Sequence, residues 1–155
     1  MSSAPIKAGV IGHPIAHSLS PRLHGYWLKH YGIHGSYDAI DVAPETLKDW
    51  LRAMPENGFA GCNITIPHKE KAVEAMDVLS PMADMLGAVN TVIVKEDGTL
   101  FGDNTDAYGF TQNLKSNGKQ LNLEHVLVLG AGGAARSVIA GLRAMGAEQL
   151  SISNR

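Results

Sequence analysis

Short apolar runs alternate with longer amphipathic stretches between Ile6 and Met76, and proline or glycine marks each change of pattern. The short runs at 6–11, 37–42 and 61–66 predict three strands. After each run, apolar residues recur at spacings of three and four, which predicts helices that begin at Ser20-Pro21, Pro44 and Pro67. This strand-helix rhythm is typical of a largely parallel sheet covered by helices.

The pattern changes after Gly87. Two β-rich runs, 88–95 and 99–102, flank an Asp-Gly pair at 97–98, and such a pair between strands predicts a hairpin. A helix is expected over 107–114 and should end near Asn117-Gly118. The polar stretch 115–124 then separates two units, so we expect a first domain at residues 1–105 and the start of a second at 106–155.

The second unit contains a glycine-rich turn between a strand at 125–129 and a helix at 137–145, with another strand at 150–153. The segment VLVLGAGGAAR matches the pattern G-x-G-x-x-A at Gly130, Gly132 and Ala135. Gly130 permits a tight turn, Gly132 lets the backbone approach a pyrophosphate, and Ala135 allows close helix-strand packing. Amide groups at the start of the helix would then hold the anion, although a glycine-rich turn without a ligand is the simpler alternative.

Asn154 and Arg155 stand where enzymes that use NAD carry an acidic residue for the ribose 2′-hydroxyl. An arginine there suits the 2′-phosphate of NADP, so NADP is favoured over NAD, with a solvated surface arginine as the alternative. A dinucleotide-binding domain normally contains two β-α-β halves, and only the first lies within these 155 residues. We therefore expect the chain to be part of a longer protein.

Polar residues in the first domain form two further patterns. Ser18 and Ser20 lie two residues apart before a helix, where both hydroxyls could donate to one carboxylate, although helix capping by Ser20 is the simpler interpretation. Asn63 and Thr65 share one face of the third strand near its C-terminal end. Ligands of open α/β sheets gather at that edge, so this pair is a candidate for ligand binding.

Lys69 falls in the first turn of the helix expected after Pro67, where the helix dipole disfavours a cation by about 0.3–1 kcal/mol. The same field would ease deprotonation, which suits a lysine that exchanges protons, although Lys71 leaves open a merely solvated basic face. Asp103 and Asp106 in GDNTD could cap the next helix. If Asp106 instead meets Lys69 across a cleft, the two form an acid-base pair for the proton of a substrate hydroxyl.

Composition narrows the possible partners. Thirteen basic and fifteen acidic side chains give a net charge of -2 without a long run of one sign, which argues against nucleic acid or an anionic membrane. Cys62 is the only cysteine, so an internal disulfide and a thiolate zinc cluster are excluded, and a reducing, cytoplasmic setting fits best. We expect no signal peptide, no membrane span and no metal site, because the seven histidines lack an obvious set of ligands.

Five segments together resemble one family. In chain order they are HPIAHSLSPRLH, GFAGCNITIPHKE, GAVNTV, GDNTDAYGF and VLVLGAGGAARSV. With them the sequence resembles the shikimate dehydrogenases of aromatic amino acid biosynthesis, from about Gly9 to the last residue. The resemblance implies an α/β fold in which a substrate domain with a mostly parallel mixed sheet, flanked by helices, precedes the first β-α-β of a Rossmann domain. It also implies NADPH-dependent reduction of 3-dehydroshikimate to shikimate by a monomer or homodimer.

The resemblance further implies residue roles. Lys69 and Asp106 would be the catalytic pair. The substrate would be bound by Ser18, Ser20, Asn63, Thr65, Lys69, Asn90 and Asp106. The cofactor NADP would be bound by Gly130, Ala131, Gly132, Gly133, Ala134, Asn154 and Arg155. Two alternatives stay open: a quinate/shikimate dehydrogenase that uses NAD or NADP, and a non-catalytic binding fragment if the molecule ends at Arg155.

Overall fold

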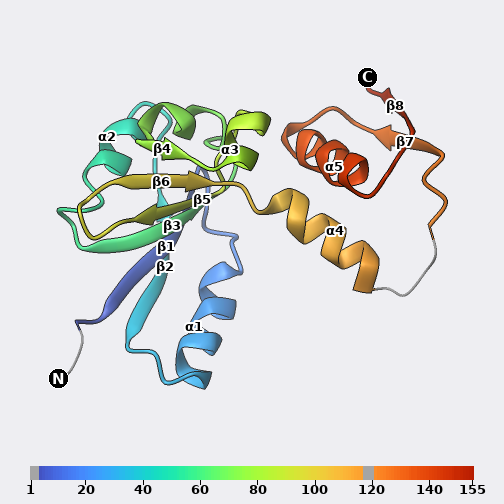
Figure 1. The fold of residues 1–155 in the computed structure, drawn as a ribbon. Coiled ribbons are helices and arrows are strands. Elements are labelled where there is room, and N and C mark those ends of the chain that lie inside the picture. The colour runs from blue at the N-terminus through green and yellow to red at the C-terminus, as the bar shows by residue number, and fades with distance from the viewer. Residues whose placement is uncertain (1–3, 117–120) are drawn as a thin grey trace. The chain divides into compact units, whose positions relative to one another are not determined.

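The structure, a computed structural model, describes residues 4–116 and 121–155 (Figure 1). Two sequence predictions, the helix end near Asn117-Gly118 and the middle of the polar stretch 115–124, lie outside the described residues. Contacts divide the chain into two compact units, Met1–Asn104 and Thr105–Arg155. Each unit has a sheet of its own, so each is described separately.

Within its described residues, the first unit has a six-stranded sheet with the strand order β2-β1-β3-β5-β6-β4 (Figure 1). Its strands are β1 (Ile6–Gly12), β2 (Gly35–Asp41), β3 (Phe59–Ile64), β4 (Val78–Leu79), β5 (Thr91–Val94) and β6 (Leu100–Asp103). Strand β1 pairs in parallel with β2 and β3, and β4 pairs in parallel with β6. Strand β5 is antiparallel to both β3 and β6. The expected mixed, mostly parallel sheet is confirmed.

Helices cover this sheet. They are α1 (Ser20–His30), α2 (Leu47–Arg52), the 3-10 helix η1 (Lys71–Ala75) and α3 (Pro81–Leu86). The core is formed by α2, η1 and α3 with the sheet, and its fully buried side chains include Ile11, Leu51 and Leu100. Helix α1 packs against β1 and β2, yet none of its residues is fully buried. Across the described parts of the chain, every helix is too short or too polar to span a bilayer.

The hairpin predicted around Asp97-Gly98 is confirmed. Strands β5 and β6 pair from Thr91 opposite Asp103 to Val94 opposite Leu100. Gly98 has a φ of 85°, a conformation that glycine adopts without steric cost. The hairpin therefore places the residues that precede β5 beside the end of β6.

The helix predicted to begin at Pro44 starts later. Residues 44–46 form a turn in which the Thr46 amide donates to the Ala43 carbonyl oxygen, and α2 begins at Leu47. Strand β4 and helix α3 were not predicted. Helix α3 follows Ser80, whose hydroxyl oxygen accepts a hydrogen bond from the Ala83 amide and so caps the helix.

The helix predicted to begin at Pro67 is wrong. A turn closed by the His68 amide and the Thr65 carbonyl oxygen follows β3, and only the five residues Lys71–Ala75 form a 3-10 helix. His68 gives the physical reason. Its imidazole is fully buried, and its Nε2 lies 2.7 Å from the Val42 carbonyl oxygen. The chain therefore turns inward at this point and does not continue outward as an amphipathic helix.

The second unit consists of α4 (Asp106–Ser116), β7 (His125–Leu129), α5 (Gly133–Ala144) and β8 (Gln149–Ser153) in its described residues. Strands β7 and β8 pair in parallel, which confirms the predicted β-α-β unit. Helix α5 begins at Gly133, directly after the glycine-rich turn, and not at Ser137 as predicted. Helix α4 packs on α5. The two helices approach closely at Gly141, where an added Cβ would lie 2.9 Å from Cγ2 of Thr111.

Candidate functional site

Polar side chains of the first unit meet where β3 ends and β5 begins. Asn63, on β3, has its Nδ2 3.5 Å from the carbonyl oxygen of Asn90 and 3.3 Å from Oγ1 of Thr91. Thr91 Oγ1 in turn donates to Asn90 Oδ1 at 2.8 Å. Two of the residues predicted to bind substrate, Asn63 and Asn90, therefore belong to one hydrogen-bonded cluster.

Tyr37, on β2, fixes the orientation of the Asn63 amide. Its hydroxyl donates to Asn63 Oδ1 at 2.6 Å, so the Nδ2 of Asn63 is directed toward Asn90 and Thr91. The Tyr37 ring stacks on His24, with 3.9 Å between the ring centroids. Burial, with a smaller contribution from Cys62, raises the pKa of Tyr37 from 10.0 to about 12. The hydroxyl thus stays protonated and can donate throughout the neutral range.

The loop after β3 brings Lys69 and Thr65 to the same edge. The carbonyl oxygen of Lys69 accepts a hydrogen bond from the Val89 amide at 2.8 Å. Lys69 is thus bonded to the residue that directly precedes Asn90. The Thr65 amide donates to the Ile11 carbonyl oxygen at 3.0 Å. Both side chains are half-buried. Four predicted site residues, Asn63, Thr65, Lys69 and Asn90, are thus carried by adjoining segments of one sheet edge.

The electrostatic argument that singled out Lys69 is wrong, although the residue lies at this edge. Lys69 precedes η1 and is not in the first turn of an α-helix. A five-residue 3-10 helix that begins at Lys71 supplies little dipole field at Lys69. The buried turn at His68 accounts for the difference, because it delays the helix beyond Lys69.

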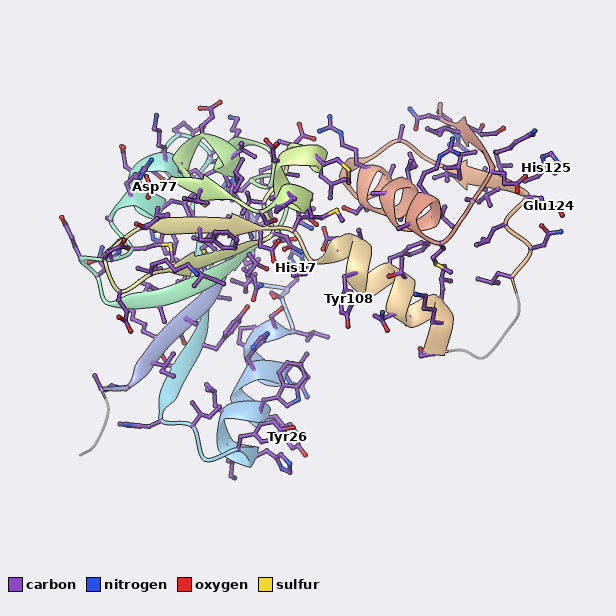
Figure 2. The ribbon with its side chains drawn as sticks, viewed as in Figure 1. His17, Tyr26, Asp77, Tyr108, Glu124 and His125 are labelled. Carbon is purple, nitrogen blue, oxygen red and sulfur yellow. The ribbon has the colours of Figure 1, made fainter. Side chains whose placement is uncertain are left out.

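Ser18 lies on the segment between β1 and α1, directly after His17 (Figure 2), and Ser20 lies at the start of α1. Ser20 is the first residue of α1, and no side chain caps this helix, so the predicted capping role of Ser20 is wrong. The reason is positional: a capping side chain must precede the helix. Instead, Ser18 Oγ accepts from the Ser20 amide at 3.3 Å, and the Ser18 amide donates to the Ile15 carbonyl oxygen at 2.9 Å. Binding of a carboxylate by both serines stays a prediction.

The two aspartates of GDNTD have different positions. Asp103 Oδ1 accepts hydrogen bonds from the Ser80 hydroxyl at 2.5 Å and from the Asn104 amide at 2.7 Å, so it joins the end of β6 to the start of α3. Asn104 is buried, and its Nδ2 donates to the Ala88 carbonyl oxygen. Asp106 is half-buried and begins α4 in the second unit. Its pairing with Lys69 stays a prediction.

The glycine-rich turn of the second unit has the backbone that a pyrophosphate requires. Gly130 has a φ of 101°, which favours glycine, and Gly132 is extended immediately before α5. A Cβ added at Gly130 or Gly132 would meet no described atom within 4 Å, so the space above the turn is open. Open backbone at the start of a twelve-residue helix fits an anionic ligand.

The end of β8 adjoins this turn. Asn154 Oδ1 accepts a hydrogen bond from the Ala131 amide at 3.2 Å, so Asn154 holds the turn in place. A cavity of about 470 Å³ is lined by Leu129, Gly130, Ser153, Asn154 and Arg155. Arg155 is exposed at its margin, which suits a phosphate group. The residues of this unit therefore fit the adenosine end of a phosphorylated dinucleotide.

Several residues of these clusters were missed from the sequence. Tyr37 and Thr91 contact Asn63, and their proximity depends on the pairing of β3 with distant strands, which local pattern does not reveal. His13 and Asp41 form a close pair at the ends of β1 and β2.

Across residues 4–116 and 121–155, no group of three or more His, Cys, Asp or Glu side chains is arranged to hold a metal ion.

The fold and these clusters define an α/β protein with a polar site at a strand edge and a separate dinucleotide-type β-α-β unit. The protein family described as the shikimate dehydrogenase substrate binding domain matches residues 10–92. A shikimate dehydrogenase (NADP+) of Cereibacter sphaeroides is 52% identical over 150 residues, which cover 96% of this chain and 54% of that relative. The chain belongs to the shikimate dehydrogenase family.

Solved structures agree with this assignment. The shikimate 5-dehydrogenase of Thermus thermophilus in complex with NADP(H) and shikimate is similar with a TM-score of 0.89 and 46% identity, over 97% of this chain and 56% of that one. The quinate dehydrogenase of Corynebacterium glutamicum in complex with NAD gives a TM-score of 0.90 and 32% identity, over 97% and 55% of the two chains. The chain spans about half the length of the curated relatives it matches.

The raised pKa of Tyr37 gives a pH prediction. Because the fold favours the neutral phenol, the contribution of Tyr37 to stability is fully present below pH 10 and is lost as the pH rises toward about 12. The measurement is the ultraviolet absorbance of phenolate during an alkaline titration, taken as wild type minus Tyr37→Phe, with circular dichroism as the control for folding. A difference titration centred at pH 10 would contradict the buried position of this hydroxyl.

Proposed function

We propose that this chain provides the substrate site and the start of the cofactor site of an NADPH-dependent enzyme that reduces 3-dehydroshikimate to shikimate in the cytoplasm. The observation that carries the proposal is the cluster of Asn63 and Asn90 beside Lys69 at one sheet edge. The similarity to shikimate dehydrogenases that bind shikimate and NADP(H) supports it. Residues 1–105 are the substrate domain in this proposal, and residues 106–155 begin the NADP-binding domain.

The substrate is a ring that carries hydroxyl groups and one carboxylate, and the proposed contacts match those groups. Asn63, Thr65 and Asn90 offer amide and hydroxyl groups, which both donate to and accept from substrate hydroxyls. Ser18 and Ser20 offer two hydroxyl donors to the carboxylate. The fixed orientation of the Asn63 amide supports this role, because a preset donor loses less rotational freedom when substrate binds.

NADP fits the second unit. The backbone of Gly130, Ala131, Gly132, Gly133 and Ala134 would hold the pyrophosphate, and Asn154 with Arg155 would form the start of the 2′-phosphate site. The open turn and the adjoining cavity support this placement. When bound, the cofactor supplies the hydride that reduces the substrate ketone.

The protein's own part in the reaction is the proton. When the ketone carbon gains a hydride, its oxygen gains negative charge, and the Lys69 ammonium stabilises this oxygen and transfers a proton to it. Asp106 accepts a hydrogen bond from the same hydroxyl and so orients it for proton transfer. One hydride and one proton convert the ketone to the alcohol, and both catalytic residues return to their starting charge after Lys69 regains a proton from solvent.

Lys69→Met is the direct test of this role, and Lys71→Met is the matched control because Lys71 is an exposed lysine two residues away. In the full chain, we expect Lys69→Met to lower kcat for shikimate oxidation about 10²–10⁴-fold, since the substitution removes a general acid-base group. Lys71→Met should leave kcat close to wild type. Equal kcat values for the two variants would remove Lys69 from the mechanism.

The similarity to a quinate dehydrogenase bound to NAD gives a second candidate function. Initial rates with shikimate or quinate, each with NADP+ or NAD+, distinguish the two. We expect the highest kcat/KM for shikimate with NADP+, and we expect Arg155→Ala to lower kcat/KM for NADP+ about tenfold while that for NAD+ changes little. A preference for quinate with NAD+ would establish the second function in place of the first.

A further inference from the structure

His13 and Asp41 form a close pair at the edge of the sheet where β1 and β2 end. His13 directly follows β1, and Asp41 is the last residue of β2, opposite Gly12 in the parallel ladder. His13 Nδ1 lies 2.6 Å from Asp41 Oδ1, and the two side chains are 48% and 50% exposed. Pairs this exposed contribute about 0–1 kcal/mol to stability.

The pair is connected to the serines of the proposed substrate site. The His13 amide donates to the Ile66 carbonyl oxygen, which fixes the segment after β1 against the loop after β3. Ile15 is buried, and its carbonyl oxygen accepts from the Ser18 amide at 2.9 Å. Ser18 Oγ then accepts from the Ser20 amide. His13 and Ile15 therefore hold the beginning of the segment that leads to Ser18 and Ser20.

Asp41 interacts with both of those residues. Its hydrogen bond with the His13 side chain is the largest effect and lowers the pKa of Asp41. Burial, the second-largest effect, raises this pKa, and smaller lowering effects come from the charge of His13, the backbone of Ile15 and the charge of His68. These groups come from the segment after β1 and from the loop after β3. Asp41 is thus a carboxylate at neutral pH that joins the end of β2 to the segment after β1.

We infer that Asp41 and His13 are positioning residues, which hold residues 13–18 so that Ser18 and Ser20 are placed for the substrate carboxylate. This inference rests on the proposed function, because it concerns the carboxylate contact of the same site. Neither residue touches the reacting atoms in this account. Their loss should therefore weaken substrate binding and leave the chemical step intact.

The test compares Asp41→Ala, Asp41→Asn and a matched control, Asp77→Ala. Asp77 also forms an exposed ion pair, with Arg52 at 2.5 Å, and also accepts a backbone hydrogen bond, from Leu100 (Figure 2). Asp41→Ala should raise the KM for shikimate about tenfold, with kcat within about twofold of wild type, and should speed amide exchange at Ser18 about tenfold. Asp41→Asn keeps an acceptor oxygen, so its changes should stay within about threefold. Asp77→Ala should change neither quantity.

Each other outcome has a defined meaning. Unchanged exchange at Ser18 in Asp41→Ala would overturn the inference, whether or not shikimate binds. Equal effects of Asp41→Ala and Asp77→Ala would also overturn it, because they would reflect general destabilisation. If shikimate does not bind the wild-type protein while Asp41→Ala still speeds exchange at Ser18 selectively, the proposed function fails and the positioning of the segment by Asp41 stands.

Discussion

The reversal of direction at β5 is the constraint on which the first unit's site depends. Strand β3 has a parallel neighbour, β1, on one side and an antiparallel neighbour, β5, on the other. The ends of β1 and β3 therefore meet the start of β5 at one edge of the sheet. Asn63 and Asn90, 27 positions apart in sequence, come within hydrogen-bond distance for this reason. A fully parallel sheet would place the start of β5 at the opposite edge.

Hydrogen bonds to neutral groups then fix this edge. Tyr37 and Thr91 hold the Asn63 amide, and the backbone bond between Val89 and Lys69 holds the loop after β3. The buried imidazole of His68 anchors that loop to the end of β2. The donors and acceptors are thus set in place by the fold, which lowers the ordering cost of binding a polar ring. The second unit carries its own preset feature, the open glycine turn before α5.

Local pattern was sufficient for the strands other than β4, for the hairpin at Asp97-Gly98 and for the glycine-rich turn, because each depends on a few adjacent residues. It failed where a distant contact decides the structure. The buried His68 delays the helix expected at Pro67. The helix-dipole argument for Lys69 fails for this reason, because Lys69 does not lie in a helix. The Ser-Pro pair at 20–21 does not cap a helix, whereas the same pair at 80–81 does. The contacts of Tyr37 and Asp41 depend on how strands distant in the sequence pair, and local pattern does not reveal that pairing.

The most direct measurement of the central claim is a titration of the isotopically labelled chain with shikimate, followed by nuclear magnetic resonance. The account predicts that the side-chain amide signals of Asn63 and Asn90 shift together with the backbone amide of Lys69, along one binding curve. The side-chain amide of Asn57, whose Nδ2 donates to the Ala53 carbonyl oxygen, serves as the internal reference. Side-chain amide signals of Asn63 and Asn90 that stay unchanged at saturating shikimate would contradict the account.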